Sequence, residues 1–114
     1  MIRLFHCDDS DSMRLLVREQ FAEHARVEIV GGAADPDGAI SGAAEAQPDV
    51  VLLDLLDPVN ADRLVAGLRR AAPGARIVVY SGYPAETARL GHGGADGYVE
   101  KSAPFEVLER AIVG

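Results

Sequence analysis

Cysteine is almost absent from this sequence, since Cys7 is the only one among 114 residues. An intramolecular disulfide is therefore excluded, as is typical of proteins from reducing compartments. The sequence also lacks an apolar stretch that approaches transmembrane length, and its N-terminus lacks the pattern of a signal peptide. We therefore expect a cytoplasmic protein that has no membrane partner.

Positive charge is scarce as well. Eleven basic residues stand against 18 acidic ones, and the resulting net charge of -7 argues against direct binding to nucleic acid. Lys101 is the only lysine, because all the other basic residues are arginine. A compact ammonium differs from a planar guanidinium in reach and hydration. Position 101 is therefore a candidate functional residue.

The length and composition predict one ordinary globular domain. The chain is close to the commonest domain size, and 48% of its residues are hydrophobic and 25% charged. It contains no internal repeat, low-complexity segment or linker. We expect a single domain over residues 1–114, with no output domain in this chain.

Two periodicities alternate along the chain. Short apolar runs typical of buried parallel strands cover 2–7, 26–33, 49–54, 75–81 and 96–101. Segments with helical spacing cover 12–24, 35–47, 61–72, 85–94 and 104–113, and the fourth is weakened by its glycines. Five strands that alternate with five helices predict a doubly wound (βα)5 fold of the α/β class, in which a parallel sheet carries helices on both faces.

Polar side chains stand where four of the five predicted strands end: Asp8 and Asp9, then Asp54, Ser81 and Lys101. In an open parallel sheet, ligands bind beyond the carboxyl ends of the strands. Three carboxylates at one edge repel one another unless a cation lies between them, and Mg²⁺ or Mn²⁺ suits oxygen ligands. Together with a lysine and a hydroxyl they predict a phosphoryl-binding site with Asp54 as the nucleophile.

Four segments carry a family resemblance that covers essentially the whole chain: "HCDDS", "DVVLLDLLDP", "VVYSG" and "GADGYVEKSAPFEVLERAI". They resemble the receiver domain of two-component response regulators, the CheY-like group. The resemblance implies a flavodoxin-like strand order of 2-1-3-4-5. It also implies that Asp54 is the phosphoacceptor and that Mg²⁺ is held by Asp8, Asp9, Asp54 and the backbone carbonyl of Leu56.

The same resemblance assigns further roles. Ser81 matches the Ser/Thr switch position, Tyr98 the switch aromatic and Lys101 the lysine that pairs with the phosphoryl group. It implies a sensor histidine kinase as the phosphoryl donor and a signalling role with intrinsic phosphotransfer and autodephosphorylation, rather than a separate enzyme activity. The last motif resembles receivers that carry helix-turn-helix output domains and regulate transcription. Apart from the resemblance, we expect partners, including a second copy in a homodimer, to bind through the first and last helices, because Pro84 and three glycines leave little helix propensity in 84–94.

The chain also departs from the family pattern. Asp57 and the residues after it replace an apolar residue and a glycine-containing turn, and Ser102 stands where many members have proline. These departures leave open a non-phosphorylated module that binds proteins. An aspartyl-phosphate phosphatase is disfavoured, because Leu56 occupies the position of its general acid.

Structural roles compete for several of these residues. The "DDSDS" stretch could cap a helix, and Tyr98 could be a half-buried strand residue. His6 and Cys7 are neighbours on a strand and point to opposite faces, so we expect a packed His6 rather than a zinc site. His24 is expected at the surface. The spacing predicts one apolar stripe on the first helix: Met13, Leu16, Val17 and Phe21.

Overall fold

The computed structural model of the chain describes residues 1–54, 60–82 and 94–114. The strands are β1 (Ile2–Cys7), β2 (Val27–Ala33), β3 (Val50–Leu53), β4 (Arg76–Ser81) and β5 (Gly97–Glu100). The helices are α1 (Asp11–Phe21), α2 (Pro36–Ala46), α3 (Ala61–Ala71) and α5 (Phe105–Val113). Each of these elements was predicted to within three residues at either end, and the helix predicted over 85–94 falls almost wholly outside the described ranges.

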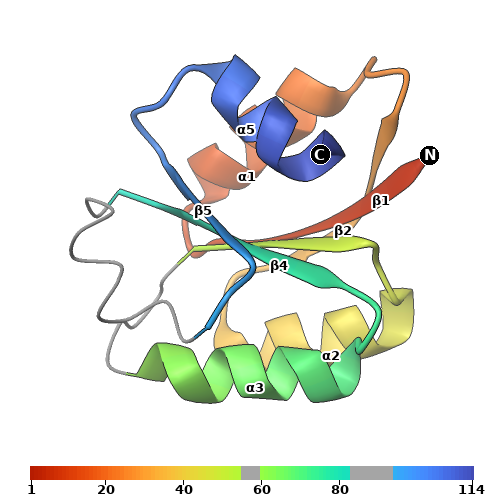
Figure 1. Ribbon diagram of the computed structural model, residues 1–114, viewed down its shortest axis with the longest axis vertical. Helices are drawn as coiled ribbons and strands as arrows, with labels where there is room; N and C mark the ends of the chain where they lie inside the picture. Colours follow the sequence, from red (N-terminus) through yellow and green to blue (C-terminus); the bar gives the residue numbers. More distant parts are fainter. Residues whose placement is uncertain (55–59, 83–93) are drawn as a thin grey trace.

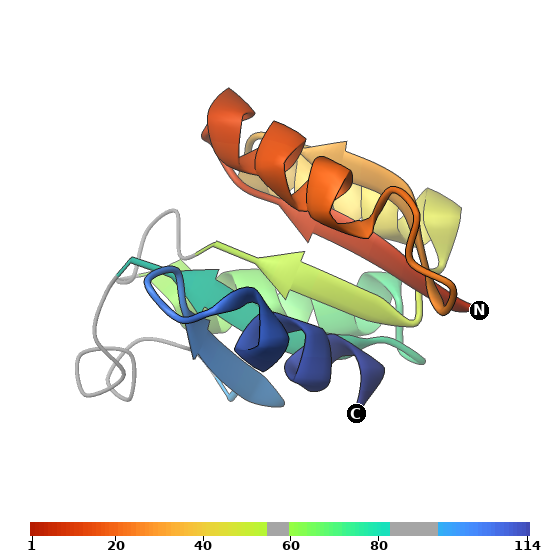
Figure 2. The same cartoon turned by 90° about the horizontal axis from the view of Figure 1, so that it is seen from above.

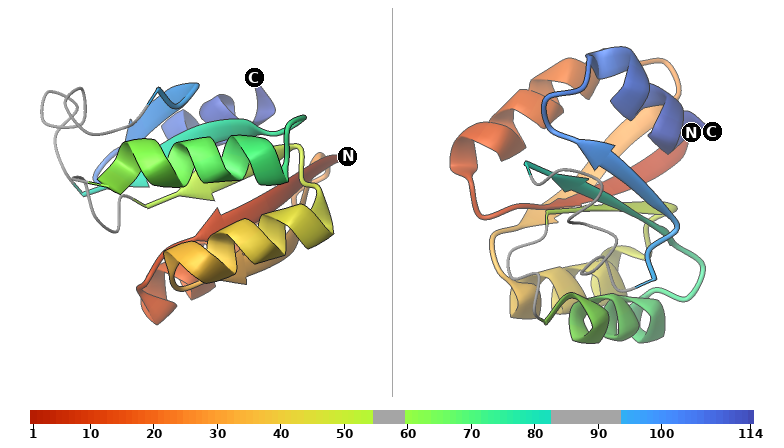
Figure 3. Two further views of the ribbon diagram at one scale, coloured as in Figure 1. Left: turned by 90° about the horizontal axis from the view of Figure 1, so that it is seen from below. Right: turned by 60° about the vertical axis from the view of Figure 1, so that its left-hand side comes forward.

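All five strands are parallel and form one sheet in the order β2-β1-β3-β4-β5, which confirms the predicted fold and strand order. Figure 1 shows α1 and α5 above the sheet and α2 and α3 below it. The views from above in Figure 2 and from below in Figure 3 show the same two pairs covering opposite faces. No helix within the described ranges has both the length and the apolar character needed to cross a bilayer.

The two faces of the sheet build two apolar cores, because successive strand residues point to opposite sides. The core under α2 and α3 includes Phe5, Cys7, Val51, Leu53 and Ile77, and the core under α1 and α5 includes Leu4, Val17, Phe21, Leu52 and Tyr80. The predicted stripe on α1 is wrong for Leu16, whose side chain is 44% exposed. The buried stripe runs through Met13, Val17 and Phe21 at i, i+4 and i+8, and Leu16 lies beside it.

Phe5 fills the space between the sheet and α2 at a point where the backbones come close. A Cβ atom added at Gly42 would lie 2.6 Å from Cζ of Phe5, and one added at Gly31 would lie 3.1 Å from Cε2. Both distances are shorter than ordinary contacts between carbon atoms. The ring therefore fits between α2 and β2 because these two positions are glycine.

Candidate functional site

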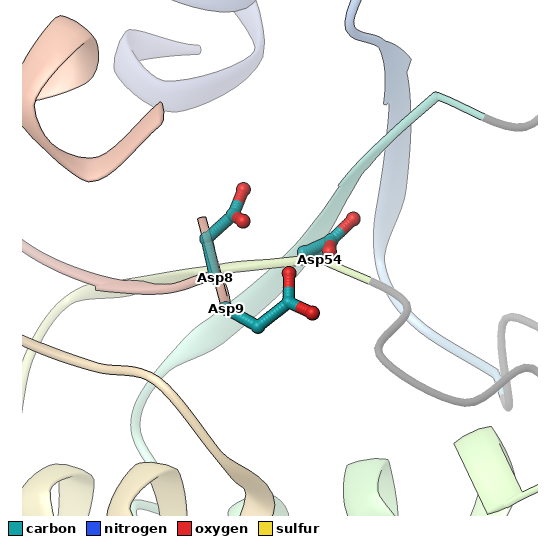
Figure 4. Close-up of side chains that lie close together, drawn as sticks. All are labelled: Asp8, Asp9 and Asp54. Carbon is teal, nitrogen blue, oxygen red and sulfur yellow. The ribbon is translucent and has the colours of Figure 1, made fainter. Parts of the chain in front are cut away.

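Three carboxylates meet where β1 and β3 end. Asp8 and Asp9 follow β1, and Asp54 follows β3, its neighbour in the sheet (Figure 4). The backbone N–H of Asp54 donates to the carbonyl of Cys7 at 2.8 Å, so the parallel ladder itself brings the two strand ends into register. One ligand oxygen from each carboxylate lies within 4.8 Å of the others. The predicted convergence of these acids at one edge is confirmed.

The turn after β1 is fixed by local hydrogen bonds. The backbone N–H of Ser10 donates to Oδ1 of Asp8 at 2.9 Å, and the Ser10 hydroxyl accepts from the backbone N–H of Met13 as the N-cap of α1. The guanidinium of Arg14 donates to the backbone carbonyl of Asp8 and to the carboxylate of Asp11. The capping interpretation of "DDSDS" is thus right for Ser10, while Asp8 and Asp9 remain directed at the site.

Lys101 reaches both strands that carry the acids. Its Nζ atom lies 2.8 Å from Oδ2 of Asp8 and 3.4 Å from Oδ1 of Asp54. Its backbone N–H donates to the carbonyl of Ser81 at 2.8 Å, which joins the ends of β5 and β4. The only lysine of the sequence therefore supplies the positive charge at the acidic cluster.

The charges perturb one another's ionisation. Burial raises the pKa of Asp8, but the nearby His6 and Lys101 side chains and the Ser10 N–H outweigh this effect and bring its pKa to about 2. Burial also raises the pKa of Asp54; the charge of Lys101 opposes this rise, and the charge of Asp8 adds to it. Burial by itself lowers the pKa of Lys101, but contact with Asp8 and Asp54 raises it overall. The resting site thus holds an ionised Asp8 against a protonated Lys101.

Ser81 and Tyr98 lie on neighbouring strands beside this cluster. Ser81 is completely buried at the end of β4, and Tyr98 is partly buried on β5. Burial raises the pKa of Tyr98, and a hydrogen bond from the Ser81 side chain opposes the shift. The two proposed switch residues therefore interact through their side chains. Leu56, whose backbone carbonyl was predicted to bind the metal, and Asp57 both lie outside the described residues.

The donor set fits a hard divalent cation. Asp8, Asp9 and Asp54 offer only carboxylate oxygens, which Mg²⁺ and Mn²⁺ prefer. Asp9 is exposed and Asp54 is half-buried, so an ion could approach from solvent. Cys7 is buried in the core under α2 and α3, while Leu4, two residues before His6 on β1, lies in the core under α1 and α5, so His6 and Cys7 point to opposite faces as predicted.

Sequence reasoning missed two contributors to the site. The guanidinium of Arg14 donates a hydrogen bond to the backbone carbonyl of Asp8. In the sequence Arg14 is only one basic residue in the first turns of α1, so nothing there indicated this contact. His6 was predicted to be a packed strand residue, and it is only 3% exposed, but its approach to Asp8 was not foreseen. Strand alternation could have shown it, because residues two apart on β1 share a face.

Comparison with known proteins gives one consistent answer. Residues 4–113 match the sequence model of a family described as the response regulator receiver domain. The response regulator GacA of Pseudomonas aeruginosa is 30% identical over 98% of this chain, which corresponds to 54% of the relative's length. The chain therefore spans about half the length of this curated relative.

Solved structures agree in fold. The signal receiver domain of the putative response regulator NarL from Mycobacterium tuberculosis has a TM-score of 0.82 at 26% identity and covers 98% of this chain and 93% of that one. A response regulator from Burkholderia pseudomallei, solved with a phosphorylated aspartic acid, a calcium ion and citrate, has a TM-score of 0.79 at 25% identity. This match covers 98% of this chain and 66% of that one.

Proposed function

Because the chain belongs to the response regulator receiver domain family, we propose that it is a switch in which Asp54 accepts a phosphoryl group from a sensor histidine kinase. The observation that supports this most directly is the convergence of Asp8, Asp9, Asp54 and Lys101 on one edge of the sheet. The phosphorylated aspartic acid and calcium ion in the Burkholderia relative support the same chemistry.

The transfer would proceed by attack of an Asp54 carboxylate oxygen on the phosphorus of a phosphohistidine. The new O–P bond forms as the N–P bond breaks, and the leaving imidazole nitrogen takes up a proton. Asp8 and Asp9, with Asp54, would hold Mg²⁺ or Mn²⁺, which when bound neutralises charge on the phosphoryl oxygens. The Asp54 side chain is 13% exposed, so the phosphohistidine would have to reach it at the open edge of the sheet.

Lys101 and Ser81 would then bind the phosphoryl group on Asp54. The Lys101 ammonium, already 3.4 Å from Asp54, can pair with a phosphoryl oxygen on that residue. The Ser81 hydroxyl can donate to another, which would release its interaction with Tyr98. Phosphorylation of Asp54 would in this way change the conformation at the end of β5 and the contacts of the Tyr98 ring. The main-chain hydrogen bond from Lys101 to Ser81 would couple any movement of these two strand ends.

The partners beyond the kinase also belong to this proposal. Leu15 and Leu16 on α1 and Val107 on α5 are large apolar side chains left 43% to 56% exposed, and they support a homodimer through these helices. Relatives of about twice the length are response regulators, which supports an output such as transcription control in the cytoplasm. We propose no enzyme activity apart from phosphotransfer to Asp54 and its later hydrolysis.

The test uses acetyl phosphate as a small phosphoryl donor. The purified chain incubated with acetyl phosphate and Mg²⁺ should gain the mass of one phosphoryl group, and a chelator should prevent the gain. Asp54→Asn should abolish it, while Asp62→Asn, an exposed acid on α3, should leave it intact. Label that persists on Asp54→Asn would refute the assignment of the acceptor.

A further inference from the structure

His6 is a polar side chain in an apolar place. It lies on β1, it is 3% exposed, and neither ring nitrogen has a hydrogen-bond partner among the described residues. Its strand neighbours on the same face are Leu4, fully buried in the core under α1 and α5, and Asp8. A buried imidazole without partners costs stability that an aliphatic side chain at the same position would not. The residue therefore calls for an explanation other than packing.

The ring is directed towards the acidic cluster. Its Nε2 atom lies 3.7 Å from Oδ2 of Asp8, which is too long for a hydrogen bond but short for two buried polar groups. A shift of less than about 1 Å would bring the pair into hydrogen-bonding range. The neutral imidazole with its proton on Nε2 can donate to this oxygen.

In the structure, the Lys101 ammonium is the partner of Oδ2 of Asp8. Its Nζ atom lies 2.8 Å from the same Oδ2 of Asp8, and the Asp8 side chain is fully buried. If Lys101 is drawn towards a phosphoryl group on Asp54, Oδ2 of Asp8 loses this ammonium, and the buried side chain has no contact with bulk water. Among the described residues, His6 is then the remaining side-chain nitrogen within 4 Å of that oxygen.

We propose that His6 is a positioning residue that donates from Nε2 to Asp8 when Lys101 turns towards Asp54, and so keeps Asp8 oriented for the divalent cation. The inference rests on the proposed function, because it requires Lys101 to move on phosphorylation. Donors to a metal-binding carboxylate, outside the ligand set itself, commonly control metal affinity.

The experiment measures Mn²⁺ binding by electron paramagnetic resonance on the full chain, with no phosphoryl donor. Lys101→Met imitates departure of the lysine and leaves His6 as the side-chain nitrogen nearest to Oδ2 of Asp8 among the described residues. In that background His6→Leu should weaken Mn²⁺ binding roughly tenfold, and His6→Gln, which keeps a donor near the Nε2 position, should stay within about threefold. Leu4→Val, a core substitution on the same face of β1, should not change the affinity.

A second measurement separates positioning from packing. Urea unfolding with a chelator present should find His6→Leu in the otherwise natural chain at least as stable as the natural chain, because it removes an unsatisfied buried polar group. A bound Mn²⁺ repels the Lys101 ammonium from Asp8, so the same variant should still bind Mn²⁺ more weakly, and the loss should be only about threefold because Lys101 is present. This pair of results also decides the question if the Lys101→Met background does not fold.

Two outcomes would overturn the proposal. The first is that a protein binds Mn²⁺ with the same affinity with and without His6→Leu. The second is that His6→Leu and His6→Gln lose the same amount of Mn²⁺ affinity. Failure of the proposed function looks different. In that case the natural chain itself would bind no Mn²⁺ or would gain no phosphoryl group on Asp54, before any change at His6.

Discussion

The ammonium of Lys101 is held by the fully buried carboxylate of Asp8, with 2.8 Å between Nζ and Oδ2. The two residues follow β5 and β1, which have β3 and β4 between them in the sheet. A single side chain therefore spans the carboxyl edge of the sheet. A change in the position of the Lys101 ammonium changes the electrostatic environment of a proposed metal ligand three strands away.

This relationship predicts that Lys101→Arg is not a conservative change. A planar guanidinium keeps the positive charge but cannot occupy the compact position of the ammonium, which is only 21% exposed between Asp8 and Asp54. Phosphorylation by acetyl phosphate should slow by about tenfold. The amide chemical shifts of β5 should also respond less to it. Phosphorylation at the natural rate, with the natural shift changes in β5, would show that Lys101 has no coupling role.

Acid unfolding should report on Asp8. Its pKa of about 2 in the fold lies below the ordinary 3.8, so its ionised form stabilises the fold by about 2 kcal/mol. This contribution is fully present above pH 3.8 and is lost as the pH falls through about 2. Asp8→Asn should therefore be less stable than the natural chain near neutral pH, and the difference in unfolding free energy should shrink on acidification. Urea unfolding with a chelator measures it, and a difference that is independent of pH would contradict the assignment.

Asp54 should behave in the opposite way. Burial raises its pKa above the ordinary value, so its ionised form costs stability at pH values above its pKa in the fold. Asp54→Asn should consequently raise the free energy of unfolding near neutral pH, and the gain should disappear in acid. Asp62→Asn on the exposed first turn of α3 is the matched control. A loss of stability in Asp54→Asn would mean that pairing with Lys101 outweighs burial.

Gly42 gives a test of the packing under α2. Alanine is normally favoured over glycine inside a helix by about 1 kcal/mol. At this position a Cβ atom would lie 2.6 Å from the Phe5 ring, so Gly42→Ala should instead destabilise the fold by about 1–3 kcal/mol. Adding Phe5→Leu should recover part of the loss, while Ser41→Ala on the exposed side of α2 should be close to neutral. A stabilising Gly42→Ala would show that the ring moves aside freely.

The elements and the acidic cluster could be predicted because their signals are local. Apolar runs mark β1, β3 and β4, and the parallel topology places the residues that follow them on one edge. Asp8, Asp54 and Lys101 were thus expected to meet from strand ends alone, and they do. The register of neighbouring strands needs no side-chain detail to produce this result.

Contacts between helices could not be predicted in the same way. Leu16 satisfies the helical spacing of α1 and yet is exposed, because the direction in which α1 faces depends on how α5 packs beside it. His24 was expected at the surface but is only 16% exposed, and its Nε2 lies 2.7 Å from Oε2 of Glu109 on α5. The two partners are far apart in the sequence, so neither residue type nor spacing indicates the pair.

The His24–Glu109 pair should link the loop after α1 to α5 measurably. Nδ1 of His24 accepts from the backbone N–H of Arg26, which leaves Nε2 as the donor to Glu109. Glu109→Gln and His24→Ala should each cost about 0.5–1 kcal/mol of unfolding free energy. A double-mutant cycle should return a coupling of similar size. Additive effects in the cycle would show that the two side chains do not stabilise one another.

The strand order also bears on how the chain folds. Asp8, Asp9 and Asp54 follow the adjacent strands β1 and β3, whereas Lys101 follows β5, which joins the sheet only through β4. The chain between Asp8 and Lys101 is about twice as long as the chain between Asp8 and Asp54, and closing a longer loop costs more entropy, so we expect the carboxylates to meet before the ammonium joins them. During that interval three carboxylates face one another without their ammonium, and their repulsion opposes progress to the native state. Divalent cations in a refolding buffer should therefore accelerate the folding of this chain, and the acceleration should disappear when Asp9 is changed to Asn.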